Sequence, residues 1–313
     1  MQLIRGRHNI RPYHHGCVAT IGNFDGVHLG HSEILKRLRQ HSEREKLPGL
    51  VIIFEPQPAE FFQRGRVPPR LSRFREKFQL LRERGVDRLM VFRFNAELAS
   101  YTARQFVEEV LVEQLGIKAL IIGDDFRFGR GRDGDFGVLH DLAETHGFVL
   151  EQTPPFLFIG KRISSTYVRQ LLRYGYMREA ERMLGHPYFI EGKVVHGHKQ
   201  GRVWGFPTAN LDLHRLRSPV SGIYAVRVSG LGAELRQGVA YVGNRPIIDD
   251  PRYVLEVHMF DFDQDCYGKL IRVQFLDRIR GDMMFNSFEE MAEQIKRDCE
   301  VARERLNFEY QDA

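Results

Sequence analysis

The pattern of apolar residues along the chain changes near residue 186. Before that point, short apolar runs alternate with segments whose apolar residues recur at helical spacing, which predicts a parallel sheet covered by helices on both faces. After it, strand-like runs follow one another with short connections rich in Gly, Pro and Asp, which predicts an antiparallel barrel or sandwich. A chain of 313 residues is also too long for one ordinary domain. We therefore expect an α/β domain over residues 1–185 and a β domain over residues 186–313.

The expected elements follow from these runs. Strands of the first half are expected at residues 17–22, 49–55, 88–94, 118–123 and 148–153. Helices are expected at residues 74–85, 103–116, 136–147, 165–174 and 177–184. Strands of the second half are expected at residues 188–196, 223–228, 237–242, 253–262 and 270–279. A carboxy-terminal helix over residues 287–306 would begin with a capping box of Ser287 and Glu290. Its predicted apolar face consists of Phe288, Met291, Ile295 and Val301.

Composition limits the class of protein. Hydrophobic residues make up 42% and charged residues 28% of the chain, as in soluble globular proteins. Three scattered cysteines argue against a disulfide framework or a zinc site and favour a reducing cytoplasm. The sequence predicts neither a signal peptide nor a membrane span. The net charge of +5 is modest and comes without the clustered basic stripe typical of nucleic-acid binding. We expect a cytoplasmic protein with no membrane or nucleic-acid partner, and a monomer is compatible with the sequence.

The segment from Thr20 to His31 is the most informative motif. A Gly-rich turn follows an apolar run, and His28 and His31 then open a helical pattern. The N–H groups and dipole of a helix start attract phosphate, and imidazoles at this spacing can face the same oxygens. Gly30 would let a phosphate approach the backbone. The motif offers no Ser, Cys or Lys nucleophile, so it favours charge stabilisation during direct nucleotidyl transfer. The alternative is a pair of solvated surface histidines.

Three further segments of the first half could share one crevice with this motif. Phe54 to Pro58 ends a strand with a rigid turn, so Phe54 either lies over a planar ring or belongs to the core. Residues 123–129 offer two aromatic side chains and an Arg for stacking on a flat ligand. Residues 162–169 begin a helix with hydroxyl and Arg side chains suited to a triphosphate, or form an ordinary capped surface helix.

A second Gly-rich segment follows the first predicted strand of the second half. Gly197, Gly201 and Gly205 stand four residues apart, which frees backbone N–H groups to surround a phosphate. Thr208 and Asn210 lie two apart, so in an extended segment their oxygen atoms point the same way, as a Mg²⁺ site requires. The alternative is a Gly-rich hairpin loop with ordinary turn residues.

Glu256 interrupts an otherwise apolar strand. A carboxylate is costly to bury unpaired, so this residue needs an explanation. It is either the outward residue of an alternating strand or a base that takes a proton from a substrate hydroxyl. Periodicity alone favours the outward position. The chain lacks the Gly-x4-Gly-Lys-Ser/Thr pattern, so a kinase here would not be of the P-loop type.

Six motifs in this order resemble the bacterial bifunctional riboflavin kinase/FMN adenylyltransferase (FAD synthetase) family: GNFDGVHLGH, FEPQP, GDDFRFG, RISSTYVR, GFPTAN and LEVHMFDFDQDCYG. The resemblance covers nearly the whole chain. It implies a Rossmann-like nucleotidyltransferase domain that joins AMP from ATP to FMN, giving FAD and pyrophosphate. It also implies a small barrel that phosphorylates riboflavin with ATP and Mg²⁺. The chain departs from the family at Ile247, where a Thr is common.

The residue patterns and the resemblance together give the candidate site residues. The resemblance implies that His28 and His31 steady the reacting phosphates and that Glu256 assists the riboflavin 5′-hydroxyl. The nucleotide-binding candidates are Gly22, Asn23, Asp25, Gly30, Arg162, Ser165, Thr166, Arg169, Gly197, Gly201 and Gly205. The flavin-binding candidates are Phe54, Pro56, Pro58, Asp125, Phe126 and Phe128. The Mg²⁺ candidates are Thr208 and Asn210.

Two other interpretations stay open on the sequence. One is an enzyme with a single working half, in which the barrel only binds flavin. The other is an RNA-binding regulator, which the basic charge balance and the barrel would allow and which would bind RNA with a steep salt dependence.

Overall fold

The computed structural model describes residues 1–63, 67–197, 205–213, 217–244 and 253–308. The chain divides into two compact units, Met1–Pro68 with Ser72–Ser164, and Pro69–Leu71 with Ser165–Ala313. Helices α7 (Ser165–Tyr174) and α8 (Met177–Leu184) therefore group with the second unit, where α8 contacts two strands of the barrel. The expectation that the first functional domain extends to residue 185 stays a prediction.

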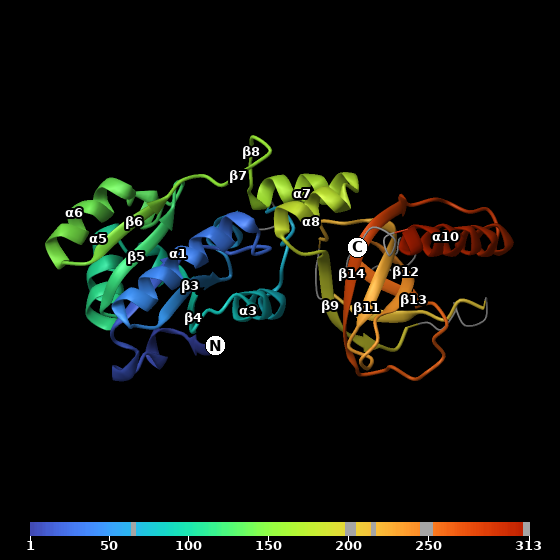
Figure 1. Cartoon of the computed structure of the whole chain (residues 1–313), viewed down its shortest axis with the longest axis horizontal. Coiled ribbons are helices and arrows are strands. Elements are labelled where there is room, and N and C mark those ends of the chain that lie inside the picture. Colours follow the sequence, from blue (N-terminus) through green and yellow to red (C-terminus); the bar gives the residue numbers. More distant parts are fainter. Residues whose placement is uncertain (64–66, 198–204, 214–216, 245–252, 309–313) are drawn as a thin grey trace. The chain divides into compact units, whose positions relative to one another are not determined.

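The first unit is built on a parallel sheet, as predicted, but the sheet has six strands where the sequence predicted five (Figure 1). Its strands are β1 (Gln2–Arg5), β2 (Cys17–Ile21), β3 (Gly49–Glu55), β4 (Arg88–Arg93), β5 (Ile117–Gly123) and β6 (Val149–Thr153). They lie in the order β1-β4-β3-β2-β5-β6, and every neighbouring pair is parallel. Strand β2 is buried at every residue, as expected where helices cover both faces of a sheet. The edge strand β1 was not predicted, because only Ile4 of its four residues is buried.

The helices of the first unit include two five-residue helices that were not predicted, and one expected helix takes another form. They are α1 (Leu29–Glu45), α2 (Pro58–Phe62), α3 (Phe74–Glu83), α4 (Ala96–Ser100), α5 (Ala103–Gln105), η3 (Phe106–Gln114) and α6 (Phe136–His146). The predicted helix 103–116 is a short α-helical turn that continues as the π-helix η3. A π-helix keeps the buried positions close to those of an α-helix over two turns, so the apolar pattern does not reveal it. Three-residue 3-10 turns lie at η1 (Arg7–Asn9), η2 (Pro12–His14) and η4 (Arg130–Arg132), and a hairpin joins β7 (Leu157–Phe158) to β8 (Lys161–Arg162).

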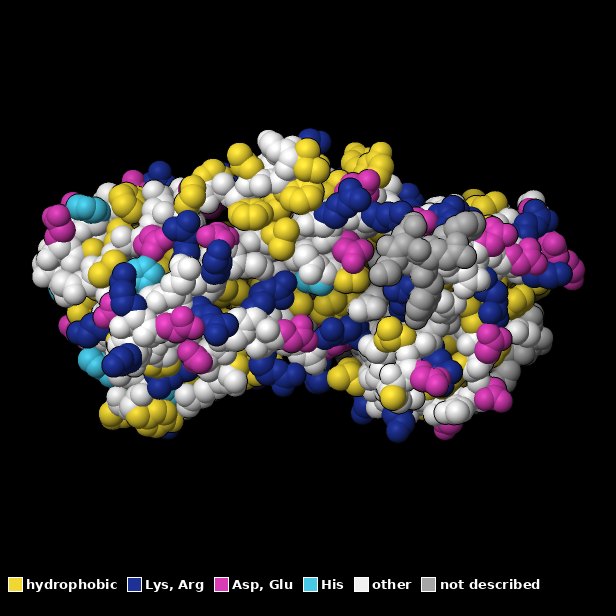
Figure 2. Space-filling model, viewed as in Figure 1, with side chains coloured by type: hydrophobic (Ala, Val, Ile, Leu, Met, Phe, Trp, Pro, Cys, Tyr) yellow, Lys and Arg dark blue, Asp and Glu magenta, His cyan; other side chains and the backbone are white. Residues whose placement is uncertain are grey.

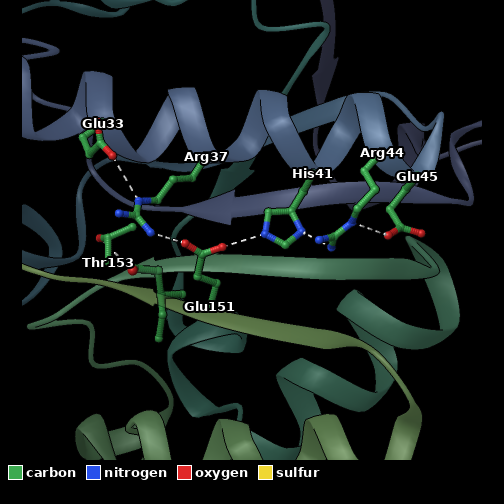
Figure 3. A network of polar contacts seen from close by, with 8 residues as sticks. Glu33, Arg37, His41, Arg44, Glu45, Glu151 and Thr153 are labelled. Carbon is green, nitrogen blue, oxygen red and sulfur yellow. Dashed lines mark hydrogen bonds and ion pairs between the residues drawn. The ribbon is translucent and has the colours of Figure 1, made fainter.

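A network of ion pairs ties α1 to β6 (Figure 3). Arg37 pairs with Glu33 one turn earlier, at 3.2 Å, and with Glu151 on β6. The other oxygen of Glu151 lies 2.6 Å from Nε2 of His41, whose Nδ1 lies 2.7 Å from Arg44. Burial raises the pKa of Glu151, but the hydrogen bonds from Arg37 and His41 outweigh it, so the carboxylate pKa is lowered. The network fixes the direction of α1 along the sheet, and with it the placement of the first turn of α1.

The second unit is a closed antiparallel barrel, so the barrel alternative of the prediction is confirmed and the sandwich is wrong. Its strands are β9 (Tyr188–Val195), β10 (Ala209–Asp212), β11 (Gly222–Ser229), β12 (Arg236–Asn244), β13 (Tyr253–Met259) and β14 (Leu270–Arg280). They close in the order β10-β13-β12-β11-β14-β9. Strand β10 was not predicted, because its four residues are too few to display a period.

Helix α10 (Phe288–Phe308) packs on the barrel with a face that differs from the expected one. The residues that join this core are Ile295, Cys299, Ala302 and Leu306. Phe288 is 66% exposed, and Val301 does not belong to this core, so the predicted apolar face is correct in part only. Half of the predicted capping box is present: the backbone N–H of Glu290 donates to Oγ of Ser287 at 3.1 Å, whereas the Glu290 carboxylate accepts from the backbone N–H of Asn286 at 2.9 Å.

The surface carries mixed charge. On the face that Figure 2 shows, Lys and Arg side chains are interspersed with Asp and Glu. Among the helices in the described ranges, none has the length and apolarity that crossing a membrane requires.

Candidate active sites

Strand β2 ends in a turn with an unusual backbone. Phe24 and Val27 adopt left-handed conformations, with φ of 46° and 41°, which a β-branched residue such as Val rarely does. Asp25 is 2% exposed and accepts hydrogen bonds from the backbone N–H and the hydroxyl of Ser72, at 3.0 and 3.4 Å. The Ser72 hydroxyl in turn accepts from the N–H of Gly26 at 2.9 Å. Such a backbone persists only where its surroundings hold it, so Asp25 and Ser72 fix the turn that precedes α1.

His28 is the N-cap residue of α1. Its Nδ1 accepts a hydrogen bond from the backbone N–H of His31 at 3.3 Å. A neutral imidazole that accepts at Nδ1 carries its proton at Nε2, so the Nε2 edge of the His28 ring is a hydrogen-bond donor. Gly30 makes room for this ring, since a Cβ there would lie 3.2 Å from its Cε1 and Nδ1 atoms. The predicted role of Gly30 toward phosphate stays a prediction.

The two histidine rings form a stacked pair. The ring centroids of His28 and His31 are 3.7 Å apart with 14° between the planes, and Phe24 lies 4.9 Å from His31. His28 is only 6% exposed and Nδ1 of His31 is buried, so the interpretation as two solvated surface histidines is wrong. Burial lowers the pKa of His31 well below 6.5, and the charges of His28, Lys77 and Arg84 lower it further. His31 is therefore neutral at pH 7.

The segment after β3 places Phe54 in an aromatic cluster. Its ring lies 6.2 Å from Phe92 and 5.8 Å from Phe94, and it packs against the sheet core while staying partly exposed. Phe54 therefore packs on the margin of the core without being buried in it, and both interpretations of this residue stay predictions. Pro56 follows a cis peptide bond and Pro58 begins α2. A flavin contact at Phe54, Pro56 or Pro58 stays a prediction.

The loop after β5 meets the β7–β8 hairpin through charge. The guanidinium of Arg162 lies 2.7 Å from Asp124 and 3.3 Å from Asp125. Phe126 and Phe128 stack at 5.4 Å with 19° between their planes, and both pack against the core of the sheet. The structure thus brings Arg162, predicted to bind phosphate, beside Asp125, predicted to face the flavin.

The other candidates for phosphate binding are divided between the two units. Gly22 donates its N–H to Ile52 at 3.1 Å, which extends the pairing of β2 with β3, and Asn23 is exposed. Ser165, Thr166 and Arg169 lie on α7 and belong to the second unit. Their binding role, like that of Gly22 and Asn23, stays a prediction.

In the barrel, β10 and β13 bring two predicted residues together. Asn210 and Glu256 are direct cross-strand partners. The residues beside them along the strands, Ala209, Leu211, Leu255 and Val257, are buried, whereas Asn210 and Glu256 are only partly buried. Since side chains alternate along a strand, both point to the outer face of the barrel. The outward position of Glu256 is therefore confirmed, and its proximity to Asn210 follows from the register.

Gly197 lies beside the same residue pair. A side chain at Gly197 would collide with the amide of Asn210, and the Asn210 amide donates to the carbonyl of Thr208 at 3.4 Å. Gly205 adopts a left-handed φ of 81°, which supports the need for glycine there. Gly201 and Ile247 lie outside the described residues.

Sequence reasoning missed residues whose partners lie far away in the chain. Ser72 holds Asp25 across 47 positions, and no local pattern marks it. Lys77 is fully buried and acts on His31, and it lies beside the equally buried Glu76 in α3, so no apolar pattern marked this position. Tyr241 on β12 is the second cross-strand partner of Glu256. Within the described ranges, no group of three or more His, Cys, Asp or Glu could hold a metal ion.

Two family models match the chain, FAD synthetase over residues 10–167 and riboflavin kinase over residues 184–306. The bifunctional riboflavin kinase/FMN adenylyltransferase of Haemophilus influenzae is 45% identical over 307 residues, which is 98% of this chain and 100% of that one. The protein of the same name from Escherichia coli K12 is 48% identical over 305 residues, or 97% of each chain.

A solved structure also matches nearly the whole chain. A crystal structure described as a macrolide-efflux protein from Streptococcus pneumoniae has a TM-score of 0.80 at 30% identity and covers 97% of this chain and 99% of that one. The family models lie in the same order as the two units, and the relatives match from end to end. The chain therefore belongs to the bifunctional riboflavin kinase/FMN adenylyltransferase family.

Proposed function

We propose that this chain makes FAD from riboflavin in two ATP-dependent steps at two separate sites. Its family gives the two activities: a riboflavin kinase that transfers the γ-phosphoryl group of ATP to riboflavin, and an FMN adenylyltransferase that joins AMP from ATP to FMN. Riboflavin, FMN and ATP are then the substrates, and FAD is the product. The stacked histidine pair at the start of α1 is the observation that carries the assignment of adenylyl transfer to the first unit.

Adenylyl transfer needs charge stabilisation rather than a protein nucleophile. An oxygen of the FMN phosphate attacks the α-phosphorus of ATP, the bond to the bridging oxygen breaks, and pyrophosphate leaves with the negative charge. The Nε2–H of His28 and the N–H groups of the first turn of α1 are suited to donate to these oxygens. Asp25 holds the turn that shapes the nucleotide pocket, together with Gly22, Asn23 and Gly30.

The remaining candidates of this half divide between phosphate and flavin. For triphosphate binding we propose Arg162, Ser165, Thr166 and Arg169. For flavin binding we propose Phe54, Pro56, Pro58, Asp125, Phe126 and Phe128. The stacked rings of Phe126 and Phe128 favour this proposal, because aromatic side chains stack well on a flat aromatic ligand. Arg162 would exchange carboxylate partners for phosphate oxygens when ATP binds.

In the barrel we propose that Glu256 accepts the proton of the riboflavin 5′-hydroxyl as that oxygen attacks the γ-phosphorus and ADP leaves. The hydroxyl of Thr208 and the amide oxygen of Asn210, close to the Glu256 carboxylate, are the hard oxygen ligands that Mg²⁺ prefers, so the donor set fits this ion. Bound Mg²⁺ would neutralise charge on the ATP phosphates. Gly197, Gly201 and Gly205 would surround those phosphates with backbone N–H groups.

One experiment tests both steps. The purified chain is incubated with riboflavin, ATP and Mg²⁺, and the flavins are separated by chromatography. We expect FMN to appear first and FAD to follow, with both absent when Mg²⁺ is chelated. FMN without FAD would refute the first site, and unchanged riboflavin with FAD formed from added FMN would leave the barrel as a flavin-binding module.

The RNA-binding interpretation is tested in parallel. We propose a cytoplasmic enzyme without a nucleic-acid partner, in keeping with small-molecule substrates and with the interspersed charges in Figure 2. RNA affinity with a steep salt dependence would contradict this, whereas saturable ATP and FAD binding without RNA affinity would support it.

A further inference from the structure

We infer that Lys77 and Arg84 are positioning residues for adenylyl transfer, because together they form a cationic backing to His31 at the start of α1. The inference rests on the proposed role of the histidine pair. It concerns α3 and the residue after it, a part of the chain to which the six motifs gave no role (Figure 1).

Lys77 is unusual because none of its side chain is exposed. Lysine is almost never fully buried unless it is paired or has a function. The Lys77 ammonium lies 3.9 Å from the carboxylate of Glu55, the last residue of β3, and interacts electrostatically with His31. Its charge therefore lies inside the unit at the carboxyl end of the sheet, on the side of the histidine pair.

Arg84 reaches the same turn of α1 by a direct contact. Its Nε donates to the hydroxyl of Ser32 at 3.0 Å, and Ser32 is the residue after His31. Another nitrogen of the guanidinium donates to the carbonyl of Leu80 at 3.3 Å, so two hydrogen bonds hold the guanidinium group. Lys77 and Arg84 are seven residues apart, two turns of a helix, which places them on one face. Arg84 contacts the first turn of α1 directly, through Ser32.

The charged groups that act on His31 are His28, Lys77 and Arg84, in addition to burial. Two protonated imidazoles could not remain stacked at 3.7 Å without strong repulsion, so the pair needs at least one neutral ring. The cations behind His31 disfavour its protonation and lower its pKa. The backing thus keeps His31 neutral and the two rings stacked, so the Nε2–H donor of His28 has a fixed position. It also adds positive potential near the proposed polyphosphate site.

The competing explanation is that Lys77 serves only as a structural partner of Glu55. The two explanations differ in what happens to His31. A purely structural lysine can be replaced by an isosteric apolar residue with no change in the titration of a neighbouring ring. If Lys77 is part of a cationic backing, the same replacement must change the pKa of His31, because it is the positive charge of Lys77 that acts on the ring.

The test compares Lys77→Met with the wild type and with Lys118→Met, a matched control at an exposed lysine of β5. The pKa of His31 is followed by NMR in ¹³C-histidine-labelled full-length protein, with His31→Gln to assign the resonance. Adenylyl transfer from ATP to added FMN is measured between pH 5 and 8, and riboflavin phosphorylation by the same samples reports on the integrity of the barrel.

We expect the pKa of His31 to rise in Lys77→Met and the acid limb of adenylyl transfer to move to higher pH. The rate at pH 7 should fall about tenfold to a hundredfold, as when a group that supports a catalytic residue is lost. Kinase activity and the Lys118→Met control should be unchanged. Arg84→Gln, which removes the charge but keeps a donor for Ser32, should give a smaller rise in the same pKa.

An unchanged His31 pKa in folded Lys77→Met overturns the inference, even if the rate falls. If Lys77→Met does not fold, Arg84→Gln decides in the same way. The proposed function is judged separately, because its failure would be absence of adenylyl transfer in the wild type, whereas failure of this inference leaves the wild-type reaction intact.

Discussion

The two candidate sites are built in opposite ways. The first lies where parallel strands end, with His28 and Asp25 buried and two residues in left-handed backbone. The second lies on the outer face of a closed barrel, where Asn210 and Glu256 are partly exposed on regular strands. In the first site burial lowers the pKa of His31 and the charges of His28 and of the distant Lys77 and Arg84 add to it, whereas in the second site the alternation of two paired strands is enough to bring the residues together.

The strongest test of this contrast is Glu256→Gln. Removing the proposed base should slow riboflavin phosphorylation about 10²- to 10⁴-fold and leave adenylyl transfer from ATP to added FMN unchanged. Since Glu256 is outward and its strand is otherwise regular, the thermal midpoint should hardly move. Glu234→Gln, at a carboxylate that is 75% exposed, is the control. Equal losses of both activities would mean that the two sites are not separate.

The matching test of the first site is His28→Ala. Loss of the donor edge should slow adenylyl transfer about 10²- to 10³-fold while the kinase keeps its rate. Because His28 also caps α1, the alanine variant should lose about 1 kcal/mol of stability. His28→Asn restores a cap without an imidazole. We expect it to recover the stability but not the activity, and recovery of activity would show that His28 acts only through the helix.

Asp25→Ala should show how far the first site depends on its buried support. The substitution leaves the backbone N–H of Ser72 without its acceptor, which should cost about 1–3 kcal/mol of unfolding free energy in urea. Adenylyl transfer should fall with it, because the turn before His28 relaxes. Asp141→Ala, at an exposed position of α6, should change stability by less than about 0.5 kcal/mol. Similar values for both variants would contradict the support that we assign to Asp25.

The smallest expected effect concerns pH. The pKa of His31 is lowered well below 6.5 in the folded chain, so below pH 6.5 the unfolded state binds a proton that the folded state excludes. Its contribution to stability is complete above pH 6.5 and is lost as the pH falls toward the folded pKa. Unfolding of the wild type and of His31→Gln in urea at pH 5 and pH 7.5 measures this. The wild type should lose more stability on acidification, and parallel losses would show that His31 titrates normally.

Much of the fold could be predicted because local patterns agree with it. Strand β3 and helices α7 and α8 begin and end where the periodicity places them. The failures have local causes. Strands β1 and β10 have four residues each, too few to display a period, and the face of α10 was misjudged because Phe288 lies beyond the part of the helix that packs on the barrel.

The candidate sites were predictable to a similar depth. Two sequence features marked the candidate sites: the spacing of His28 and His31, and the single carboxylate of Glu256 in an apolar strand. Such features can be seen in the sequence alone, because the residue types differ from those of their neighbours. The pairing of Asn210 with Glu256 was not visible, since a register between strands is decided by the closure of the barrel.

By itself the sequence determined the order of the two architectures, the turn before α1 and the residue types that phosphate chemistry requires, since these depend on neighbours a few positions apart. Only the tertiary structure decided that Ser72 holds Asp25, that Lys77 and Arg84 stand behind His31, and that the two imidazoles stack. The physical reason is that burial and electrostatic interaction depend on distance in space, and the segment that supplies these charges lies more than 40 residues from His31 in the sequence.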